Sequence, residues 1–273
     1  MTREWFTGIV SSRNKPVTID TRVANPARVY DYWLGGKDNF AADRELAQEV
    51  IAVNPGILAE VRANRAFLGR AVRYLAAKAG VRQFLDIGTG MPTADNTHEV
   101  AQRAAPESRV LYVDNDPVVI AHAHALLTGT PDGATSYLEA DVRDVETVLA
   151  QAKRTLDFTQ PIGIMLLMIL MMIPDADPYG IVRRLVKEAP AGSYLIISHP
   201  AGDIEAQQMA DMAERLSRPG PEMTLRTHAE VSRFFDGLEL LEPGVVGLSD
   251  WRPDPGDVRP AVAAGWCGVA GKP

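Results

Sequence analysis

The chain has 273 residues and a mass of 29.7 kDa, with 46% hydrophobic and 23% charged residues, which excludes a disordered or collagen-like protein and leaves one or two globular domains. Its formal net charge of -7 argues against a nucleic-acid partner, because phosphate backbones bind to basic surfaces. Cys267 is the only cysteine, so no intramolecular disulfide can form, and a reducing, cytoplasmic location is expected.

The most apolar stretch of the chain is Ile162–Ile173, which has 12 residues. A helix that spans a bilayer needs about 20 apolar residues. We therefore expect this stretch to be a buried element and expect no membrane partner.

The N-terminal part of the sequence predicts a short arm followed by helices. Residues 1–20 are polar and form the predicted arm. Asn25–Pro26 is a typical helix start, and Gly35–Gly36 ends this first helix. A second helix is expected to begin near Ala41, and a third follows it. We predict that residues 21–80 form a helical cap or lid.

From Gln83 onward short apolar runs alternate with helical patterns, which is typical of parallel strands joined by crossover helices. Residues 81–273 are therefore expected to form a Rossmann-like α/β domain with a seven-stranded, mostly parallel sheet and an antiparallel last strand. The expected strands are Gln83–Ile87, Val110–Val113, Ser136–Glu139, Ile162–Met168, Ser193–Ser198, one near Val245 and Ala261–Val269.

Start and stop signals mark several helices of this second part. Asp116–Pro117 and Asp177–Pro178 each place an acidic N-cap before a proline, as helix starts often do. Near the C-terminus, Thr227 and Glu230 fit a capping box, and Gly237 fits the end of that helix.

A glycine-containing loop follows the first predicted strand. The segment Phe84–Thr93 reads FLDIGTGMPT, so it delivers Asp86, Gly88 and Gly90 to the start of a helix. In parallel sheets ligands bind beyond the carboxyl ends of the strands, and glycines let the backbone approach them closely. The loop indicates a nucleotide-like ligand, and a tight strand-to-helix turn without a ligand is the alternative.

Two acidic residues strengthen the first interpretation. Asp114 ends the second strand, 24 residues after Gly90. In nucleotide-binding sheets, a carboxylate about 20 residues after the glycine loop accepts hydrogen bonds from the hydroxyls of a ribose. Asp141 and Val142 end the third strand, where they are candidates for contacts with an adenine ring. Helix capping by either acid is the alternative.

The loop favours S-adenosylmethionine over a dinucleotide. A dinucleotide fingerprint has a third glycine that allows close helix packing, whereas this chain has Thr93 at that position. S-adenosylmethionine carries no pyrophosphate. We expect Asp86 to hold its ammonium group, the N–H groups of the loop to face its carboxylate, and Asp114 to hold its ribose.

Several segments resemble the bacterial S-adenosylmethionine-dependent methyltransferase family formerly catalogued as DUF574, over nearly the whole chain from about Asp20. The resemblance implies the class I methyltransferase fold, with cofactor contacts at Asp86, Gly88, Thr89, Gly90, Asp114, Asn115, Asp141 and Val142. It rests on Arg28–Phe40 (RVYDYWLGGKDNF), Asn64–Leu68, Phe84–Thr93, Tyr112–Pro117 and Ile173–Asp175.

One position departs from the family pattern. Members of the family usually carry His-Phe directly before Ile-Pro-Asp, whereas this chain has Met171 and Met172 there. A thioether accepts no proton at neutral pH, so Met171 cannot replace a histidine base. Changed substrate choice or chemistry is one interpretation, and simple packing of the methionines is the other.

The predicted cap supplies candidate lid and substrate residues. In class I methyltransferases an N-terminal segment often covers the cofactor, so the resemblance favours a lid over an ordinary capped helix. Arg65 is a candidate partner for a carboxylate, with a structural salt bridge as the alternative. The other candidates are Tyr30, Tyr32, Trp33 and Lys37.

His199 ends the fifth strand and is the candidate general base, because an imidazole accepts a proton near neutral pH. A structural role is the alternative. The other histidines lie in predicted helices without a third ligand in reach, so no metal site is expected. They are His98, His122, His124 and His228.

The sequence thus predicts an S-adenosylmethionine-dependent methyltransferase that moves the methyl group to a small-molecule acceptor by in-line displacement. A non-catalytic S-adenosylmethionine-binding protein is the alternative from another class, because no convincing base is present. An NAD-linked oxidoreductase is a weaker alternative.

Overall fold

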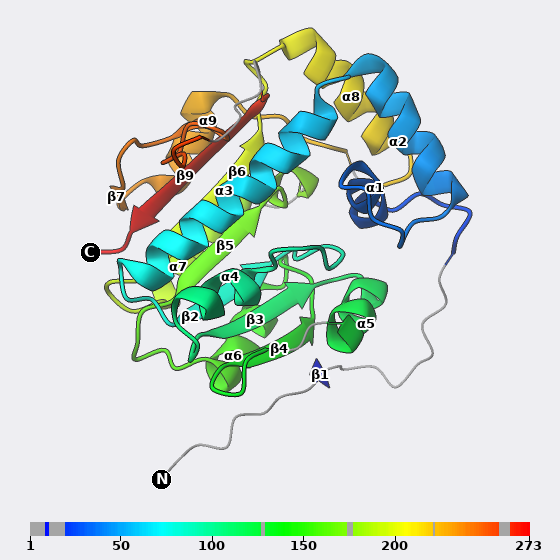
Figure 1. Cartoon of the computed structure of the whole chain (residues 1–273). Coiled ribbons are helices and arrows are strands. Elements are labelled where there is room, and N and C mark those ends of the chain that lie inside the picture. The colour runs from blue at the N-terminus through cyan, green and yellow to red at the C-terminus, as the bar shows by residue number, and fades with distance from the viewer. Residues whose placement is uncertain (1–8, 11–19, 127–128, 174–176, 221, 257–262) are drawn as a thin grey trace.

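The computed structural model describes residues 9–10, 20–126, 129–173, 177–220, 222–256 and 263–273. A central sheet carries helices on both faces, and a group of helices gathers at one end (Figure 1). The strands are β1 (Ile9–Val10), β2 (Gln83–Ile87), β3 (Arg109–Asp114), β4 (Ala134–Glu139), β5 (Gly163–Leu167), β6 (Tyr194–Pro200), β7 (Glu239–Leu240), β8 (Val246–Gly247) and β9 (Gly265–Gly271). The helices are α1 (Pro26–Trp33), α2 (Ala41–Val53), α3 (Ile57–Ala77), α4 (Thr97–Ala104), α5 (Pro117–Leu126), α6 (Val145–Thr155), α7 (Pro178–Glu188), α8 (Ala206–Ser217) and α9 (His228–Ser232), with the 3₁₀ helices η1 (Leu170–Met172) and η2 (Arg233–Phe235).

The sheet has the order β1-β4-β3-β2-β5-β6-β9-β7, with β8 paired to β9. Strands β1 to β6 pair in parallel, and β9 pairs antiparallel with β6, so the predicted mostly parallel sheet with an antiparallel last strand is confirmed. All seven predicted strands are present in the described residues. The two-residue strands β1 and β7 are additional, and residues 261 and 262 of the last predicted strand lie outside the described residues.

Alternate side chains of the central strands pack against opposite helical layers. Phe84 contributes to a core with α3, α4 and α5, whereas Leu85 contributes to a core with α6, α7 and η2. This alternation follows from the period of two residues in a strand. Because both faces are covered, the strands are apolar almost throughout, as the sequence indicated.

The helix signals act mostly as predicted. The Asn25 side chain accepts hydrogen bonds from the first turn of α1, Asp116 accepts one from Val118 N, and the Thr227–Glu230 capping box starts α9. Asp177 is the N-cap residue of α7, with Pro178 at the first position of the helix as predicted, but its side chain makes no capping hydrogen bond. The proline that follows it is sufficient to begin the helix, because its ring fixes φ.

The cap is built from both halves of the chain. Helices α1 and α2 share a hydrophobic core with α8, which follows β6 and was not predicted (Figure 1). A buried ion pair joins α1 to α2, with Arg28 Nε at 2.8 Å from Asp43 Oδ2. Helix α3, although it lies within residues 21–80, packs on the sheet with α4 and α5.

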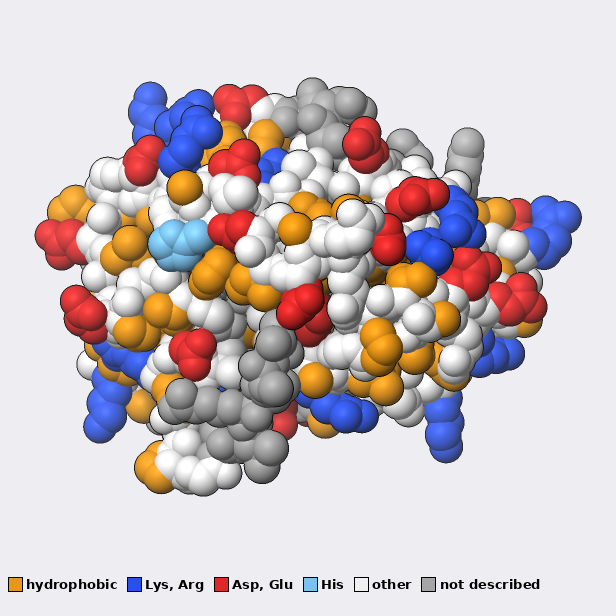
Figure 2. Space-filling model, turned by 90° about the horizontal axis from the view of Figure 1, so that it is seen from above, with side chains coloured by type: hydrophobic (Ala, Val, Ile, Leu, Met, Phe, Trp, Pro, Cys, Tyr) orange, Lys and Arg blue, Asp and Glu red, His pale blue; other side chains and the backbone are white. Residues whose placement is uncertain are grey.

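Positive and negative side chains lie interspersed over the described part of the face shown in Figure 2. Within the described ranges, none of the helices combines the length and the hydropathy needed to cross a bilayer.

Candidate functional site

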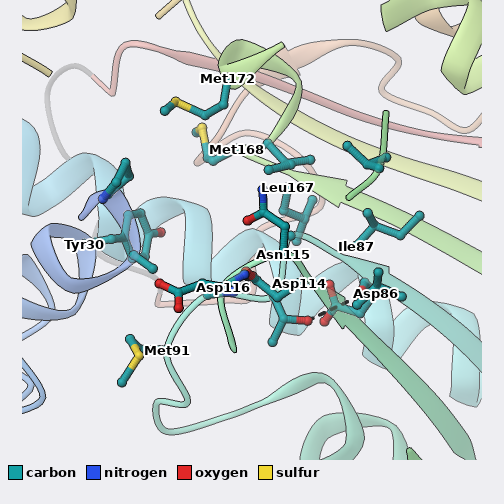
Figure 3. A pocket seen from close by; sticks show the side chains of 18 of the residues that line it. Tyr30, Asp86, Ile87, Met91, Asp114, Asn115, Asp116, Leu167, Met168 and Met172 are labelled. Carbon is teal, nitrogen blue, oxygen red and sulfur yellow. Dashed lines mark hydrogen bonds between the residues drawn. The ribbon is translucent and has the colours of Figure 1, made fainter. Parts of the chain in front are cut away.

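A cavity of about 440 Å³ lies at the carboxyl ends of the central strands. The chain runs from β2 through β3 to β4 and then returns to β5 on the other side of β2. Such a reversal of strand order opens a crevice at the carboxyl ends, where ligands of α/β sheets bind. The cavity is closed further by α1, α3 and η1 (Figure 3).

The structure brings ten of the predicted site residues together around this cavity, including all eight predicted cofactor contacts. They are Tyr30, Arg65, Asp86, Gly88, Thr89, Gly90, Asp114, Asn115, Asp141 and Val142.

The glycine loop is held tightly between β3 and the end of β5. Gly88 and Gly90 have φ values of +75° and +67°, in the left-handed region. The Gly88 N–H donates to Val113 O at 2.8 Å, and a Cβ on Gly88 would lie 2.7 Å from Ile169 Cγ1. Gly88 therefore needs glycine both for its backbone conformation and for its close approach to Ile169.

Replacing Gly88 by alanine should cost more stability than replacing Gly90. A Cβ on Gly90 meets no atom within 4 Å, so Gly90→Ala adds only left-handed strain, about 1–2 kcal/mol. Gly88→Ala adds a clash with Ile169, for which about 1–3 kcal/mol more is expected. Urea unfolding of both variants checks this difference, and equal losses would contradict the close packing of the loop.

Asp86 is a buried acid at the end of β2. Its Oδ2 accepts a hydrogen bond of 2.6 Å from Thr97 Oγ1. Burial raises the pKa of Asp86 to about 6, although the Thr97 hydrogen bond and the charge of Arg65 act in the opposite direction. A buried carboxylate of this kind favours a cationic ligand group, which would lower its pKa again.

Asp114 joins the glycine loop to the loop that follows β3. Its Oδ2 accepts a hydrogen bond from Gly90 N, and its Oδ1 accepts one from Asp116 N, both at 2.9 Å. Burial raises the pKa of Asp114. Backbone N–H groups of both loops, including that of Asn115, therefore hold the carboxylate in place at the cavity.

The acid after β4 differs from these two. Asp141 accepts hydrogen bonds from Arg143 Nε at 3.0 Å and Nη2 at 2.5 Å. These bonds, with a smaller contribution from Asn115, hold the pKa of Asp141 below its usual range. Asp141 is thus an ionised acid at the edge of the cavity, next to the buried Val142.

The backbone N–H groups of the glycine loop are already used. Gly88 and Thr89 donate to Val113 O, and Gly90 donates to Asp114. The expectation that the N–H groups of the loop face a ligand carboxylate is therefore wrong for these three residues. Helix α3 brings the cation of Arg65 to the cavity. The Nη2 of Arg65 donates hydrogen bonds to Ala94 O at 3.0 Å and to Asp95 O at 2.8 Å.

Helix α1 contributes directly to the cavity. Tyr30 lies at its wall in Figure 3, and its hydroxyl accepts a hydrogen bond from Asn64 Nδ2 at 2.9 Å and donates to Val61 O at 3.2 Å. At the start of the helix, Asn25 Nδ2 donates to Asp116 Oδ2 at 2.9 Å. The cap is thus bonded to the strand end that carries Asp114.

Three of the predicted lid residues lie elsewhere. Trp33 is buried in the core of the cap and donates from Nε1 to Ala47 O at 3.3 Å. The Tyr32 hydroxyl accepts a hydrogen bond from Gln48 on α2, and Lys37 is exposed. Neighbouring positions on a helix point in different directions, so α1, which brings Tyr30 to the cavity, turns Tyr32 and Trp33 away from it, whereas Lys37 lies beyond the end of this helix.

His199 is not at the cavity, and the expectation of a catalytic base does not fit its surroundings. It is fully buried, with Nδ1 at 2.9 Å from Pro200 O and Nε2 at 2.6 Å from Arg226 Nη1. Nδ1 therefore carries the proton, and the lone pair of Nε2 accepts from Arg226. Burial lowers the pKa of His199 to about 4, so the ring is neutral at pH 7 and packs as a structural group.

The sequence singled out Met171 and Met172 as a departure from the family pattern, but it did not predict that the segment after β5 forms a wall of the cavity. Met168, Ile169 and Met172 line it, together with Asn64 of α3. The apolar run Ile162–Ile173 contained the signal, because β5 ends at Leu167 and the residues after a parallel strand reach the ligand edge. Met171 lines the cavity too, whereas Pro174 and Asp175 lie outside the described residues.

Comparison with known proteins agrees with this geometry. A family model described as S-adenosyl methyltransferase matches residues 12–273. A solved DUF574 family protein from Streptomyces avermitilis is 44% identical, with a TM-score of 0.90, and the alignment covers 93% of this chain and 99% of that one. A provisionally assigned methyltransferase from Thermobifida fusca is 40% identical, with a TM-score of 0.84 and coverage of 92% and 96%.

Solved structures of lower identity share the fold. The plantazolicin methyltransferase, solved in complex with S-adenosylhomocysteine, is 11% identical, with a TM-score of 0.52 and coverage of 90% and 95%. No curated protein sequence matches the chain. The glycine loop and the acids at the strand ends meet at one cavity of a class I methyltransferase fold. Because the family model also matches nearly the whole chain, the protein belongs to the S-adenosyl methyltransferase family.

Proposed function

We propose that this protein binds S-adenosylmethionine in the cavity at the ends of β2, β3 and β4 and transfers its methyl group to a small-molecule acceptor. The observation that carries this proposal is the convergence of all eight predicted cofactor contacts on one cavity. The family model described as S-adenosyl methyltransferase, which matches residues 12–273, supports it.

Each part of the cavity suits one part of the cofactor. The two oxygens of the Asp114 carboxylate suit the adjacent hydroxyls of a ribose, which would bind in a bidentate manner. Asp86 suits the ammonium group of the methionine end, and Arg65 suits its carboxylate. Val142 and the ionised Asp141 lie where an adenine ring would rest, with the carboxylate as an acceptor for its amino group.

When bound, the cofactor supplies a methyl group that its sulfonium already activates. The acceptor lone pair forms the new bond to the methyl carbon, the electrons of the carbon–sulfur bond return to sulfur, and the acceptor proton leaves to water. The protein orients the two reactants, and orientation alone is worth about 7–11 kcal/mol. A neutral Tyr30, whose pKa is raised by burial, is present at the cavity to accept a hydrogen bond from the acceptor.

We expect cofactor affinity to rise with pH between pH 5 and 7. Only ionised Asp86 binds an ammonium group well, and its pKa of about 6 in the free protein means that it is largely protonated at pH 5. Affinity should fall about tenfold per pH unit below this pKa. Calorimetry with S-adenosylhomocysteine checks this, and Asp86→Asn should show weaker binding with a flatter profile; an unchanged slope in that variant would remove Asp86 from the ammonium site.

Turnover distinguishes catalysis from binding alone. The purified protein, S-adenosylmethionine and fractionated bacterial extract should yield S-adenosylhomocysteine, detected by mass spectrometry, at a rate that depends on the extract fraction. A non-catalytic binding protein would bind the cofactor tightly and yield none with any fraction.

A further inference from the structure

The cavity has two walls of different chemistry. Carboxylates from the ends of β2, β3 and β4 line one part, and the labelled Asp86, Asp114 and Asp116 lie together in Figure 3. The labelled Met168 and Met172 lie apart from them, at the end of β5 and on η1. The proposed cofactor contacts account for Asp86, Asp114 and Asp141, and Asp116 accepts hydrogen bonds from Val118 N and Asn25 Nδ2. The methionine wall is left without a proposed role.

The backbone of this methionine wall is fixed. Met168 has φ +52°, and its N–H donates to Ser198 O at 3.0 Å. Behind the turn, Leu170 O accepts from Arg226 Nη1 at 3.1 Å, and Met171 O accepts from Thr224 N at 2.9 Å. These bonds hold the main chain of η1 in place while Met168, Met171 and Met172 remain only partly buried at the cavity.

Arg226, which supports this wall from behind, is itself buried and hydrogen-bonded. Arg226 donates to the neutral His199, and its guanidinium lies 5.5 Å from the ring centre of Phe234. A rigid backbone therefore presents three flexible side chains, which is a surface that adapts to the shape of a ligand without losing its position.

The chemistry of this wall selects the kind of molecule that binds there. Thioethers are polarisable and make favourable contacts with aromatic rings. They form no strong hydrogen bonds, so they do not compensate a polar ligand group for the water that it loses on binding. A charged group would lose its water against them. An anion would in addition face the carboxylates of Asp86, Asp114, Asp116 and Asp141. The two cations of the same lining already have partners, because Arg65 donates to Ala94 O and Asp95 O, and Arg143 donates to Asp141.

We propose that the methyl acceptor is an uncharged aromatic molecule whose ring lies against Met168, Met171 and Met172. This inference rests on the proposed function, because it assigns to the acceptor the part of the cavity that the cofactor contacts leave. Tyr30, which lines the same cavity, is the polar group beside which the reacting atom of the ring would lie.

The first test compares an uncharged and an anionic naphthalene probe on the wild-type protein saturated with S-adenosylhomocysteine. Calorimetry should show that 1-naphthol binds at least tenfold more tightly than 1-naphthoate, which carries a carboxylate in place of the hydroxyl group. Equal affinities, or tighter binding of the naphthoate, would overturn the proposal, as would the failure of both probes to bind.

The second test changes the wall itself. The double variant Met171→Gln, Met172→Gln keeps the side-chain length but adds amides, and it should weaken 1-naphthol binding at least fivefold while the affinity for S-adenosylhomocysteine stays within twofold. Leu240→Gln, at a residue of edge strand β7 that is 42% exposed, is the matched control and should change neither affinity. Thermal unfolding establishes that each variant is folded.

The two proposals fail in different ways. If wild-type protein does not bind S-adenosylhomocysteine, the proposed function fails. If it binds and 1-naphthol affinity is the same in the double variant and the wild type, the acceptor inference alone is overturned.

Discussion

Replacing Asp114 by alanine should weaken the binding of S-adenosylmethionine and S-adenosylhomocysteine at least 100-fold. The carboxylate is expected to accept two hydroxyl hydrogen bonds, and bonds to a charged group are worth about 1.5–3 kcal/mol each. The variant also removes the acceptor shared by Gly90 N and Asp116 N, which disturbs the two loops that form the cavity. Isothermal titration calorimetry measures the loss.

A matched control and a modified ligand separate these two effects. Asp132→Ala removes an exposed carboxylate from the loop before β4 and should leave affinity unchanged. The affinities for S-adenosylhomocysteine and for its 2′-deoxy analogue are compared in the wild type and in Asp114→Asn. Loss of the 2′-hydroxyl should reduce affinity much less in Asp114→Asn than in the wild type, because the variant has already weakened the hydrogen bond to that hydroxyl. Equal costs in both proteins, or wild-type affinity in Asp114→Ala, would show that Asp114 does not hold the ribose.

Replacing Asp43 by alanine should destabilise the cap by about 3–5 kcal/mol, since it leaves a buried charge without its partner. Asp43 is fully buried, and it accepts hydrogen bonds of 2.8 Å from Arg28 Nε, Asn25 N and Phe40 N. Because Asn25 and Tyr30 line the cavity, loss of the cap should weaken cofactor binding as well. Hydrogen exchange of the α1 amides and chemical unfolding measure the effect.

The same helix offers a control at its surface. Glu49 on α2 pairs with Arg218 at 2.7 Å, with the two side chains 50% and 53% exposed. Exposed pairs of this kind contribute at most about 1 kcal/mol, so Glu49→Ala should change little. If Asp43→Ala costs no more than Glu49→Ala, the buried pair is not what holds α1 on α2.

The sequence predicted the sheet and the acids at its edge because these features depend on local patterns. Apolar runs of strand length, the glycines after β2, the acid that ends β3 and the acid after β4 are each visible within a few residues. Parallel strands place their carboxyl ends at one edge, so Asp86, Asp114 and Asp141 had to come close together once the strand pattern was recognised.

The local sequence pattern did not predict the structural role of His199 or which of the candidate lid residues reach the cavity. His199 has the position expected of a site residue, at the end of β6, but Arg226 from a distant segment occupies its free nitrogen. Tyr30, Tyr32 and Trp33 are near neighbours in sequence, and only the packing of α1 against α2 and α8 decides which of them reaches the cavity. Both outcomes depend on contacts between residues far apart in the chain.

The amino-acid order alone therefore determined the strands, the glycine turn and the family to which the protein belongs, because periodicity and short motifs act over neighbouring residues. The tertiary structure alone decided which side chains line the cavity, the raised pKa of Asp86, the neutral state of His199 and the position of the methionines at the cavity wall. Burial and hydrogen-bond partners set these properties, and both exist only after distant segments have packed together.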